Sequence, residues 1–469
     1  MMAAAGAVTR RSMPLFDGDV FLGDVDVLLP PGTESASSSC MDLHQQAVFP
    51  SNEIRISRRS PASERCPPLA VLQVISAYSL RCKLQAKAAD LHPKSLLRRL
   101  HDSCWKKGMT AVVEIGEEEL HLVAMQSKQV KGLACFWCWS APAGLYAACL
   151  QMLNKRCLAL VLDLDETVVF SNTAETFESR LDRIMSGLEN SELDAANESA
   201  MSDEFNRTFN DKQLLVDFNE TGTITLNFHQ TVRCHGEQAM FHKPSGHHEF
   251  IIRPVIRVPG RNAVLTRLAP MDPSTGHFVN IRPGWDDLKR YLITTSGRQR
   301  FKVYVCTMAG RAYALEIWRL LDPEGSLISL REISQRLICV RPDSKKSLER
   351  VFRDSLCHPS MAMVLDDRRD VWDERDKRRV FAAPAYKPLV APADKVVNGY
   401  SALQILTKIA CHARKGFFSE FDGMLLKNIN ELVYENEVLD LPYSPDISDY
   451  LQFKNNNTAR QGVAPILRR

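Results

Sequence analysis

Two apolar segments that end in acidic residues are the clearest feature in the pattern of hydrophobic and polar positions. The first, CLALVLDLDETVVF, begins at Cys157, and the second, MAMVLDDRRDVW, begins at Met361. Short uninterrupted apolar runs are typical of strands buried on both faces of a parallel sheet. We therefore predict two central strands that each carry acids at the carboxyl end.

The chain between these two segments alternates strand and helix patterns. After Phe278 we predict a turn, a helix, the buried strand FKVYVC, the helix RAYALEIWRLL, which ends before Asp322, and a further strand. This alternation indicates an α/β fold with a parallel sheet.

An inserted subdomain is predicted at about residues 174–275. The stretch Met185 to Asn206 is rich in Asn, Ser, Glu and Ala, which favours a mobile segment over a core element. The stretch Phe250 to Leu268 contains β-branched residues and prolines, which predicts edge strands. The insert is therefore expected to be β-rich.

The first 150 residues are predicted to form a small α+β domain. We expect a hairpin in Phe16 to Leu29, an amphipathic helix in Pro67 to Gln85 and two strands in Thr110 to Met125. The segment after Val390 has helical periodicity. The predicted organisation is an N-terminal domain at 1–150, a catalytic domain at 151–395 and a helical segment with a tail at 396–469.

Composition narrows the class of protein only moderately. The chain has 469 residues, which predicts two or three folded units, and its net charge of +3 gives no argument for nucleic-acid binding. Thirteen cysteines without regular spacing favour a reducing compartment, either cytosol or nucleus. No segment approaches the roughly 18 apolar residues that a membrane-spanning helix needs, so we expect no membrane partner.

The acids after the first apolar run suggest chemistry on a phosphate. Asp163 and Asp165 are two positions apart, so in an extended chain their side chains point to the same side. One carboxylate, Asp163, can attack phosphorus, and Asp165 can act as acid and base. Because an anionic nucleophile and an anionic substrate repel each other, such a site needs a cation, and carboxylate ligands suit Mg²⁺.

Further candidate residues follow from the same argument. Asp366 and Asp367 end the second apolar run; alone they could be a turn or a helix cap, but two strand-end acid clusters converge in one parallel sheet. Thr307 and Lys346 are candidates to neutralise the phosphoryl group, although a helix cap and a surface charge are the common roles of such residues.

The order of these motifs resembles a known superfamily. DLDET, a strand ending in Thr, a lysine and a strand ending in two acids resemble the haloacid-dehalogenase superfamily with its DxDxT signature. Further segments resemble the RNA polymerase II C-terminal-domain phosphatases, and among them the plant phosphatase-like proteins over nearly the whole chain. These segments are IRPGWDDL, VYVCTMA, KKSL, VLDDRRDVW, FDGDVFLGDVDV, PPLAVLQVISAYSLRCKL, ALEIWRLLDPEG and GFFSEFD.

The resemblance implies a haloacid-dehalogenase-like parallel sheet and a role for each candidate residue. It implies that Asp163 becomes phosphorylated, that Asp165 is acid and base, and that Thr307 and Lys346 hold the phosphate, with Lys345 as a competitor to Lys346. Thr167 would orient the nucleophile loop. Mg²⁺ would bind Asp163, Asp367 and the Asp165 carbonyl, with Asp366 beside the metal site.

The resemblance also implies a substrate and a location. It implies a nuclear protein serine phosphatase that acts on the phosphorylated C-terminal repeat domain of RNA polymerase II, with transcription factors as partners of the N-terminal domain. A small-molecule phosphatase and a transcription scaffold with a vestigial site are the alternatives. Longer relatives carry double-stranded-RNA-binding modules beyond the region where this sequence stops, so direct RNA binding is not expected. Gly310 and Ala312 flank Arg311 where the family has acids, so substrate contacts are expected to differ.

Overall fold

The chain divides into two compact units. The computed structural model describes residues 10–451 except 30–48, 50, 76–79, 88–91, 93, 191–194, 227–229, 243–247, 295, 391–393, 395–398, 437–440 and 442. The first unit contains Met1–Leu158, Phe352–Ala362 and Ala413–Tyr450, and the second contains Ala159–Val351, Met363–His412 and Leu451–Arg469. Each unit is therefore built from segments that are distant in the sequence, whereas the sequence-based division used three continuous ranges. The predicted tail after residue 451 lies outside the described residues.

The first unit contains an eight-stranded sheet with the order β3-β1-β2-β5-β8-β7-β6-β4. Most neighbouring strands are antiparallel, and β1 and β3 are parallel. The strands are β1 (Arg10–Asp17), β2 (Val20–Leu28), β3 (Ile54–Ile56), β4 (Arg58–Arg59), β5 (Leu80–Ala86), β6 (Thr110–Ile115), β7 (Glu118–Met125) and β8 (Cys135–Pro142), and the helices are α2 (Pro68–Ile75), α3 (Leu96–Lys107) and α4 (Leu145–Asn154). The predicted pair of strands in Thr110 to Met125 is confirmed as β6 and β7.

Two predictions for this unit need correction. The hairpin is present, but it begins earlier than predicted, because its two strands are β1 (Arg10–Asp17) and β2 (Val20–Leu28). Gly23 lies inside β2, next to a bulge that leaves Leu22 without a register partner. The predicted helix from Pro67 ends at Ile75, and Leu80–Ala86 is a strand. Cys82, Leu84 and Ala86 are the buried positions of that strand, so its apolar period is two and not the helical period that we assigned. Tyr78, which the predicted helix also included, lies outside the described residues.

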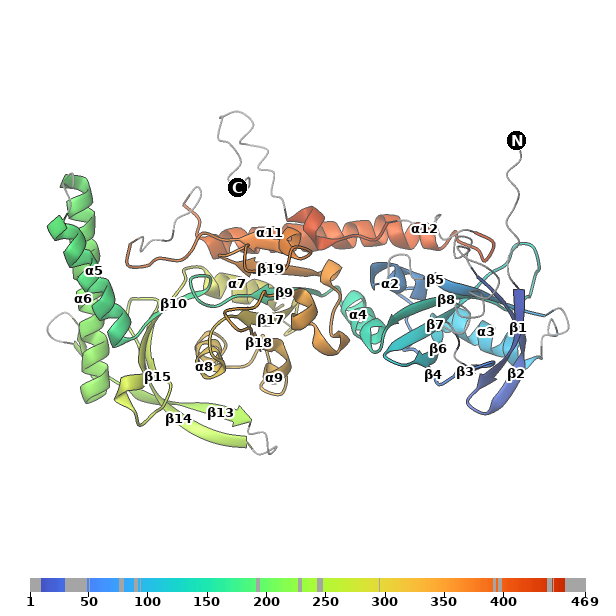
Figure 1. The fold of residues 1–469 in the computed structure, drawn as a ribbon, viewed down its shortest axis with the longest axis horizontal. Helices are drawn as coiled ribbons and strands as arrows, with labels where there is room; N and C mark the ends of the chain where they lie inside the picture. The colour runs from blue at the N-terminus through green and yellow to red at the C-terminus, as the bar shows by residue number, and fades with distance from the viewer. Residues whose placement is uncertain are drawn as a thin grey trace, which may run out of the picture. The chain divides into compact units, whose positions relative to one another are not determined.

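The second unit contains a five-stranded sheet with the order β18-β17-β9-β19-β20. The pairs β17–β18 and β19–β20 are parallel. The elements are β9 (Leu158–Leu162), β17 (Phe301–Thr307), β18 (Leu337–Cys339), β19 (Ala362–Asp366), β20 (Val380–Ala382), α7 (Trp285–Leu292) and α8 (Arg311–Leu321), followed by the short helices α9 (Ile333–Arg336) and α10 (Leu348–Val351). Every residue of β9 and β19 is buried, which confirms the two apolar runs as neighbouring central strands (Figure 1).

The insert combines the predicted strands with two long helices. Its helices are α5 (Ala174–Asn190) and α6 (Ala195–Thr221), and its larger sheet has the order β10-β16-β15-β14-β13. The strands are β10 (Val169–Asn172), β13 (His235–His242), β14 (His248–Arg257), β15 (Ala263–Arg267) and β16 (Gly276–Ile281), with the separate pair β11 (Thr223–Leu226) and β12 (Gln230–Arg233). The insert core lies between α5, α6 and this sheet and includes Phe177, Phe218 and Phe278.

Two predictions for the insert were wrong in part. The stretch Met185 to Asn206 lies within α5 and α6 wherever it is described, and the two helices run side by side (Figure 1). Its Ala, Glu and Met residues are good helix formers, which outweighed the polar composition. The strands β14 and β15 lie inside the sheet and not at its edge. Pairing of β14 with β15 begins only at Val255, so Pro254 occupies a stretch with one neighbour, where a proline is tolerated.

The predicted C-terminal helix is confirmed as α11 (Ala402–Glu420), which continues through a π-helical turn, Phe421–Leu426, into α12 (Lys427–Ile429). Within the part of the chain that the structure describes, no helix has the length and apolar character needed to cross a membrane.

Candidate active site

The DLDET segment forms a tight loop directly after β9. The backbone N–H of Asp163 donates to the carbonyl of Leu365 in β19 at 2.9 Å, so the two strand ends are tied together. The amides of Val168 and Val169 both donate to the carbonyl of Leu164, at 2.8 and 3.0 Å, and Glu166 adopts a left-handed φ of 57°. Backbone hydrogen bonds therefore fix the position of the loop.

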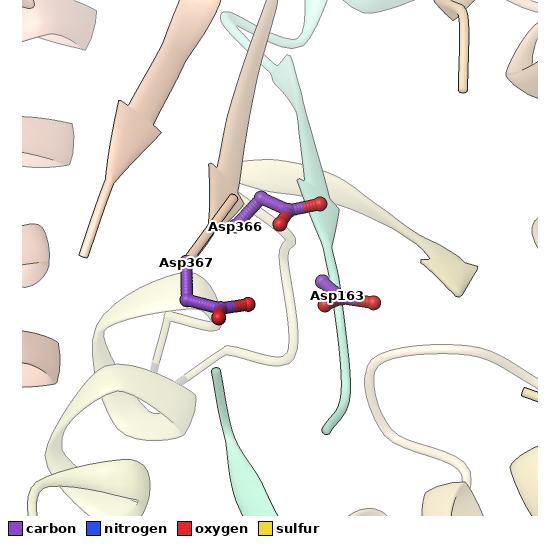
Figure 2. A group of neighbouring side chains, drawn as sticks. All are labelled: Asp163, Asp366 and Asp367. Carbon is purple, nitrogen blue, oxygen red and sulfur yellow. The ribbon is translucent and has the colours of Figure 1, made fainter. Parts of the chain in front are cut away.

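Three carboxylates converge at the ends of β9 and β19. Asp163, Asp366 and Asp367 each offer an oxygen, and these oxygens lie within 4.8 Å of one another (Figure 2). The Thr167 hydroxyl lies 3.1 Å from Asp367 Oδ1 and 3.4 Å from Asp163 Oδ2, and it accepts the Asp367 N–H at 3.0 Å. Thr167 thus holds the two strand ends at one spacing.

A buried lysine lies against this cluster. The Nζ of Lys346 is 2.9 Å from Asp163 Oδ1 and 2.7 Å from Asp366 Oδ2, and the side chain is fully buried. Its neighbour Lys345 is exposed and donates to the carbonyl of Asp370. The backbone of Lys346 bridges to Trp372, so consecutive side chains point in opposite directions. The structure therefore brings Lys346 into the site and leaves Lys345 outside it.

Asp366 differs from the other two carboxylates in its hydrogen bonds. Its Oδ2 accepts from Lys346 and from the indole of Trp372, at 2.7 and 2.8 Å, and its Oδ1 accepts from the Arg368 N–H at 2.8 Å. These donors occupy both oxygens of Asp366. Asp163 and Asp367 consequently retain more acceptor capacity for a cation.

The cluster holds more negative charge than Lys346 neutralises. Burial raises the pKa of Asp163 to about 7, with the neighbouring Asp366 charge adding to the shift and Lys346 opposing it. Burial also raises the pKa values of Asp165 and Asp367. A divalent cation favours the ionised carboxylates, and Mg²⁺ prefers oxygen ligands of this kind. The residues therefore fit a magnesium ion.

The remaining predicted residues lie at the same end of the sheet, where β9 and β17 end. Thr307 is the buried last residue of β17, the other neighbour of β9, and its hydroxyl accepts the Ala309 N–H at 3.1 Å. Asp165 is partly buried and accepts a hydrogen bond from the hydroxyl of Tyr313. Tyr313, in the first turn of α8, was not among the site residues predicted from the sequence. Its position shortly after the strand ending in Thr307 was the available signal.

Arg282 is a second residue that the sequence reasoning missed, although it lies in the IRPGWDDL motif. Its side chain is buried and pairs with Asp394 at 2.8 and 2.9 Å. It also donates to the carbonyls of Thr167 and Pro384, at 3.0 and 2.7 Å. Arg282 therefore supports the DLDET loop through its backbone.

Two family models match different parts of the chain. Residues 10–140 match the family described as CPL1/2 SPOC domain, and residues 241–413 match the NLI interacting factor-like phosphatases. The DLDET loop lies ahead of the second range, separated from it by a segment that contains β10, the helices α5 and α6, and the strands β11 and β12. Most of this second range lies in the second unit, which therefore contains a match to the NLI interacting factor-like phosphatase family.

Two curated relatives are similar to this chain in sequence, and one solved structure aligns with part of it. The chain is 43% identical over 460 residues to the RNA polymerase II C-terminal domain phosphatase-like 1 of Arabidopsis thaliana, covering 97% of this chain and 47% of the relative. It is 35% identical over 108 residues to an RNA polymerase II C-terminal domain phosphatase of Schizosaccharomyces pombe, covering 22% and 13%. A solved structure of Fcp1, an essential RNA polymerase II CTD phosphatase, aligns at 16% identity and a TM-score of 0.33, covering 64% of this chain and 71% of that one.

Over almost its whole length the chain is similar to an RNA polymerase II C-terminal-domain phosphatase-like protein, and its second unit carries the phosphatase match on an α/β fold. This confirms the resemblance inferred from the motifs. The chain spans about half the length of the Arabidopsis relative.

Proposed function

We propose that this chain is a magnesium-dependent protein serine phosphatase that dephosphorylates the C-terminal repeat domain of RNA polymerase II in the nucleus and thereby regulates transcription. The observation that carries the proposal is the contact of the buried Lys346 with Asp163, inside a carboxylate cluster at the ends of two central strands. Asp165 lies two residues beyond the nucleophile on the same loop. This arrangement suits phosphoryl transfer to a carboxylate.

In the first step, an Asp163 carboxylate oxygen attacks the phosphorus of phosphoserine, and the bond from phosphorus to the serine oxygen breaks. Asp165 donates its proton to the departing serine oxygen. The product is an aspartyl phosphate on Asp163. Lys346 and the hydroxyl of Thr307 stabilise negative charge on the phosphoryl oxygens.

In the second step, water attacks the phosphorus of the aspartyl phosphate. Asp165, now a carboxylate, takes a proton from this water, the bond from phosphorus to Asp163 breaks, and inorganic phosphate leaves. Tyr313 holds the Asp165 carboxyl group, and Thr167 holds the loop that carries both acids. The proton transfer and the release of phosphate return Asp165 and Asp163 to their starting states.

The carboxylates of Asp163 and Asp367 and the carbonyl of Asp165 would hold a magnesium ion, with Asp366 beside it. When bound, the ion neutralises charge on the carboxylates and on the phosphoryl group. The chain itself supplies the nucleophile Asp163, the acid and base Asp165, and the positive charge of Lys346.

The names of the relatives support the choice of substrate, since one is called a C-terminal domain phosphatase of RNA polymerase II and the other a C-terminal domain phosphatase-like protein. The same names support a nuclear location. The SPOC match supports a protein-binding role for the first unit. Transcription factors are the partners that we propose for it. A scaffold with a vestigial site is disfavoured because Asp163, Asp367 and Lys346 remain assembled.

Metal removal gives the first test. The purified chain should release phosphate from phosphoserine peptides of the polymerase repeat with Mg²⁺, and chelation should abolish this release because the cluster then lacks its neutralising charge. Restoring Mg²⁺ should restore the rate. Malachite-green detection measures the product. Equal release with and without chelator would contradict the proposed metal dependence.

Tyr313→Phe tests how Asp165 is positioned. The change removes the hydroxyl that donates to Asp165 and keeps the ring. We expect kcat to fall about ten-fold, as expected for the loss of one hydrogen bond to a charged group, with little change in KM. Tyr291→Phe, on α7 of the same unit, is the matched control. An unchanged kcat in Tyr313→Phe would exclude the positioning role.

A further inference from the structure

A cavity with several polar side chains in its walls lies in the second unit, and none of the three clustered carboxylates lines it. It has a volume of about 370 Å³. Its walls come from α6, from the turn between β14 and β15, from β16 and from the segment after β20. The lining side chains that matter are Arg207, Asn210, Arg261, Asn262, Asn280 and Tyr386. The volume is within the range of small-molecule and subsite pockets.

The cavity presents hydrogen-bond donors and a positive charge. Arg207 uses only Nε, which donates to the carbonyl of Leu389 at 2.8 Å; among the described residues, its two Nη groups have no acceptor. Arg261 makes a two-pronged pair with Asp211, at 2.7 and 2.9 Å, which occupies both oxygens of that carboxylate. Two guanidinium groups against one carboxylate leave a net positive charge.

The free Nη groups of Arg207 indicate what an occupant of the cavity would need to offer. A ligand with several oxygens can accept hydrogen bonds from Arg207 and from Arg261. A phosphate group has this chemistry.

One wall of the cavity is attached to the nucleophile loop. The N–H of Tyr386 donates to the carbonyl of Glu166 at 2.6 Å, and the Arg282 guanidinium that supports Thr167 lies over the Tyr386 ring at 5.4 Å. A group bound in the cavity therefore contacts a segment that also fixes the DLDET loop.

We propose that this cavity binds a second phosphoserine of the same polypeptide substrate, so that multiply phosphorylated peptides are preferred. The inference rests on the proposed function for the choice of substrate. The predicted specificity arises from Arg207 and Arg261, which bind the phosphate that is not hydrolysed.

Steady-state kinetics on paired peptides test the proposal. The peptides span two polymerase repeats. One peptide carries a single phosphoserine, and each of the others carries a second phosphoserine at a different distance from the first, on either side of it. At the favoured spacing, the intact chain should have a KM about ten-fold lower for the doubly phosphorylated peptide. Arg207→Gln should remove this advantage and leave the singly phosphorylated peptide unaffected. Arg207→Lys should restore part of it.

Arg257→Gln is the matched control, because Arg257 is an exposed arginine of the same inserted sheet and does not line the cavity. It should keep the full advantage. Peptides with Glu in place of the second phosphoserine test whether a carboxylate suffices, and we expect them to behave as singly phosphorylated. Equal KM values for all peptides, or equal effects of Arg207→Gln and Arg257→Gln, would overturn the proposal.

Binding measured without turnover separates this proposal from the proposed function. Fluorescence anisotropy with the Asp163→Asn chain should show tighter binding of the doubly phosphorylated peptide, reversed by Arg207→Gln. If no peptide is hydrolysed but this difference persists, the phosphatase assignment fails and the second phosphate site stands. If hydrolysis occurs but the difference is missing, the cavity proposal fails alone.

Discussion

Replacing Asp163 with Asn should abolish phosphate release from phosphoserine peptides while the second unit stays folded. The amide has the shape of the carboxyl group but cannot attack phosphorus, and loss of a covalent nucleophile lowers kcat by at least about a thousand-fold. The change removes one negative charge from a crowded cluster, and Lys346 keeps its contact with Asp366. Release of inorganic phosphate measures the rate, and circular dichroism measures the fold.

The covalent intermediate provides a sharper readout of the same variant. Incubation with radiolabelled phosphopeptide and quenching in acid should leave label on the intact chain and none on Asp163→Asn. Asp182→Asn, the same chemical change at an exposed position of α5, should keep both the label and the rate. Label on the Asp163→Asn chain would show that another residue is the nucleophile.

The central sheet and the convergence of acids could be predicted because both depend on local pattern. The runs before Asp163 and Asp366 are continuous and apolar, as expected for strands buried on both faces, and parallel strands place their carboxyl ends at one edge. The sheet confirms β9 and β19 as neighbours. The carboxylates Asp163, Asp366 and Asp367 consequently meet within 4.8 Å.

Errors arose where a short pattern fitted two periods or where composition was ambiguous. Pro68–Ile75 is buried at every position, so its pattern could not mark where the helix ends and the strand Leu80–Ala86 begins. The polar stretch in α5 and α6 forms helices that are stabilised by pairing with each other, for example through Arg180 and Glu204 at 2.6 Å. Tertiary pairing of this kind cannot be read from one segment.

The roles of individual polar residues depended on contacts between distant segments. The choice between Lys345 and Lys346 follows from the bridge of Lys346 to Trp372, which no periodicity indicates. Tyr313 reaches Asp165 and Arg282 reaches Asp394 across more than a hundred residues of sequence. Sequence therefore predicted which strand ends carry the site, and the fold determined which side chains meet there.

Lys346→Met should destabilise the second unit as well as abolish activity. The lysine is fully buried between Asp163 and Asp366, so its removal leaves two buried carboxylates without their cation. Removing one partner of a buried ion pair costs about 3–5 kcal/mol. Urea unfolding followed by tryptophan fluorescence measures the loss, because Trp372 is buried against Asp366. Phosphate release should fall below detection for the same electrostatic reason.

The adjacent lysine supplies the control for this prediction. Lys345→Met makes the same chemical change one residue away, at an exposed side chain, and should alter stability by less than about 0.5 kcal/mol. Adding Asp366→Asn to Lys346→Met should recover part of the lost stability, because it removes one of the orphaned charges, whereas activity should stay absent. This non-additivity is the signature of direct coupling between the two groups. Equal destabilisation by the two lysine variants would show that Lys346 is not the buried cation of the site.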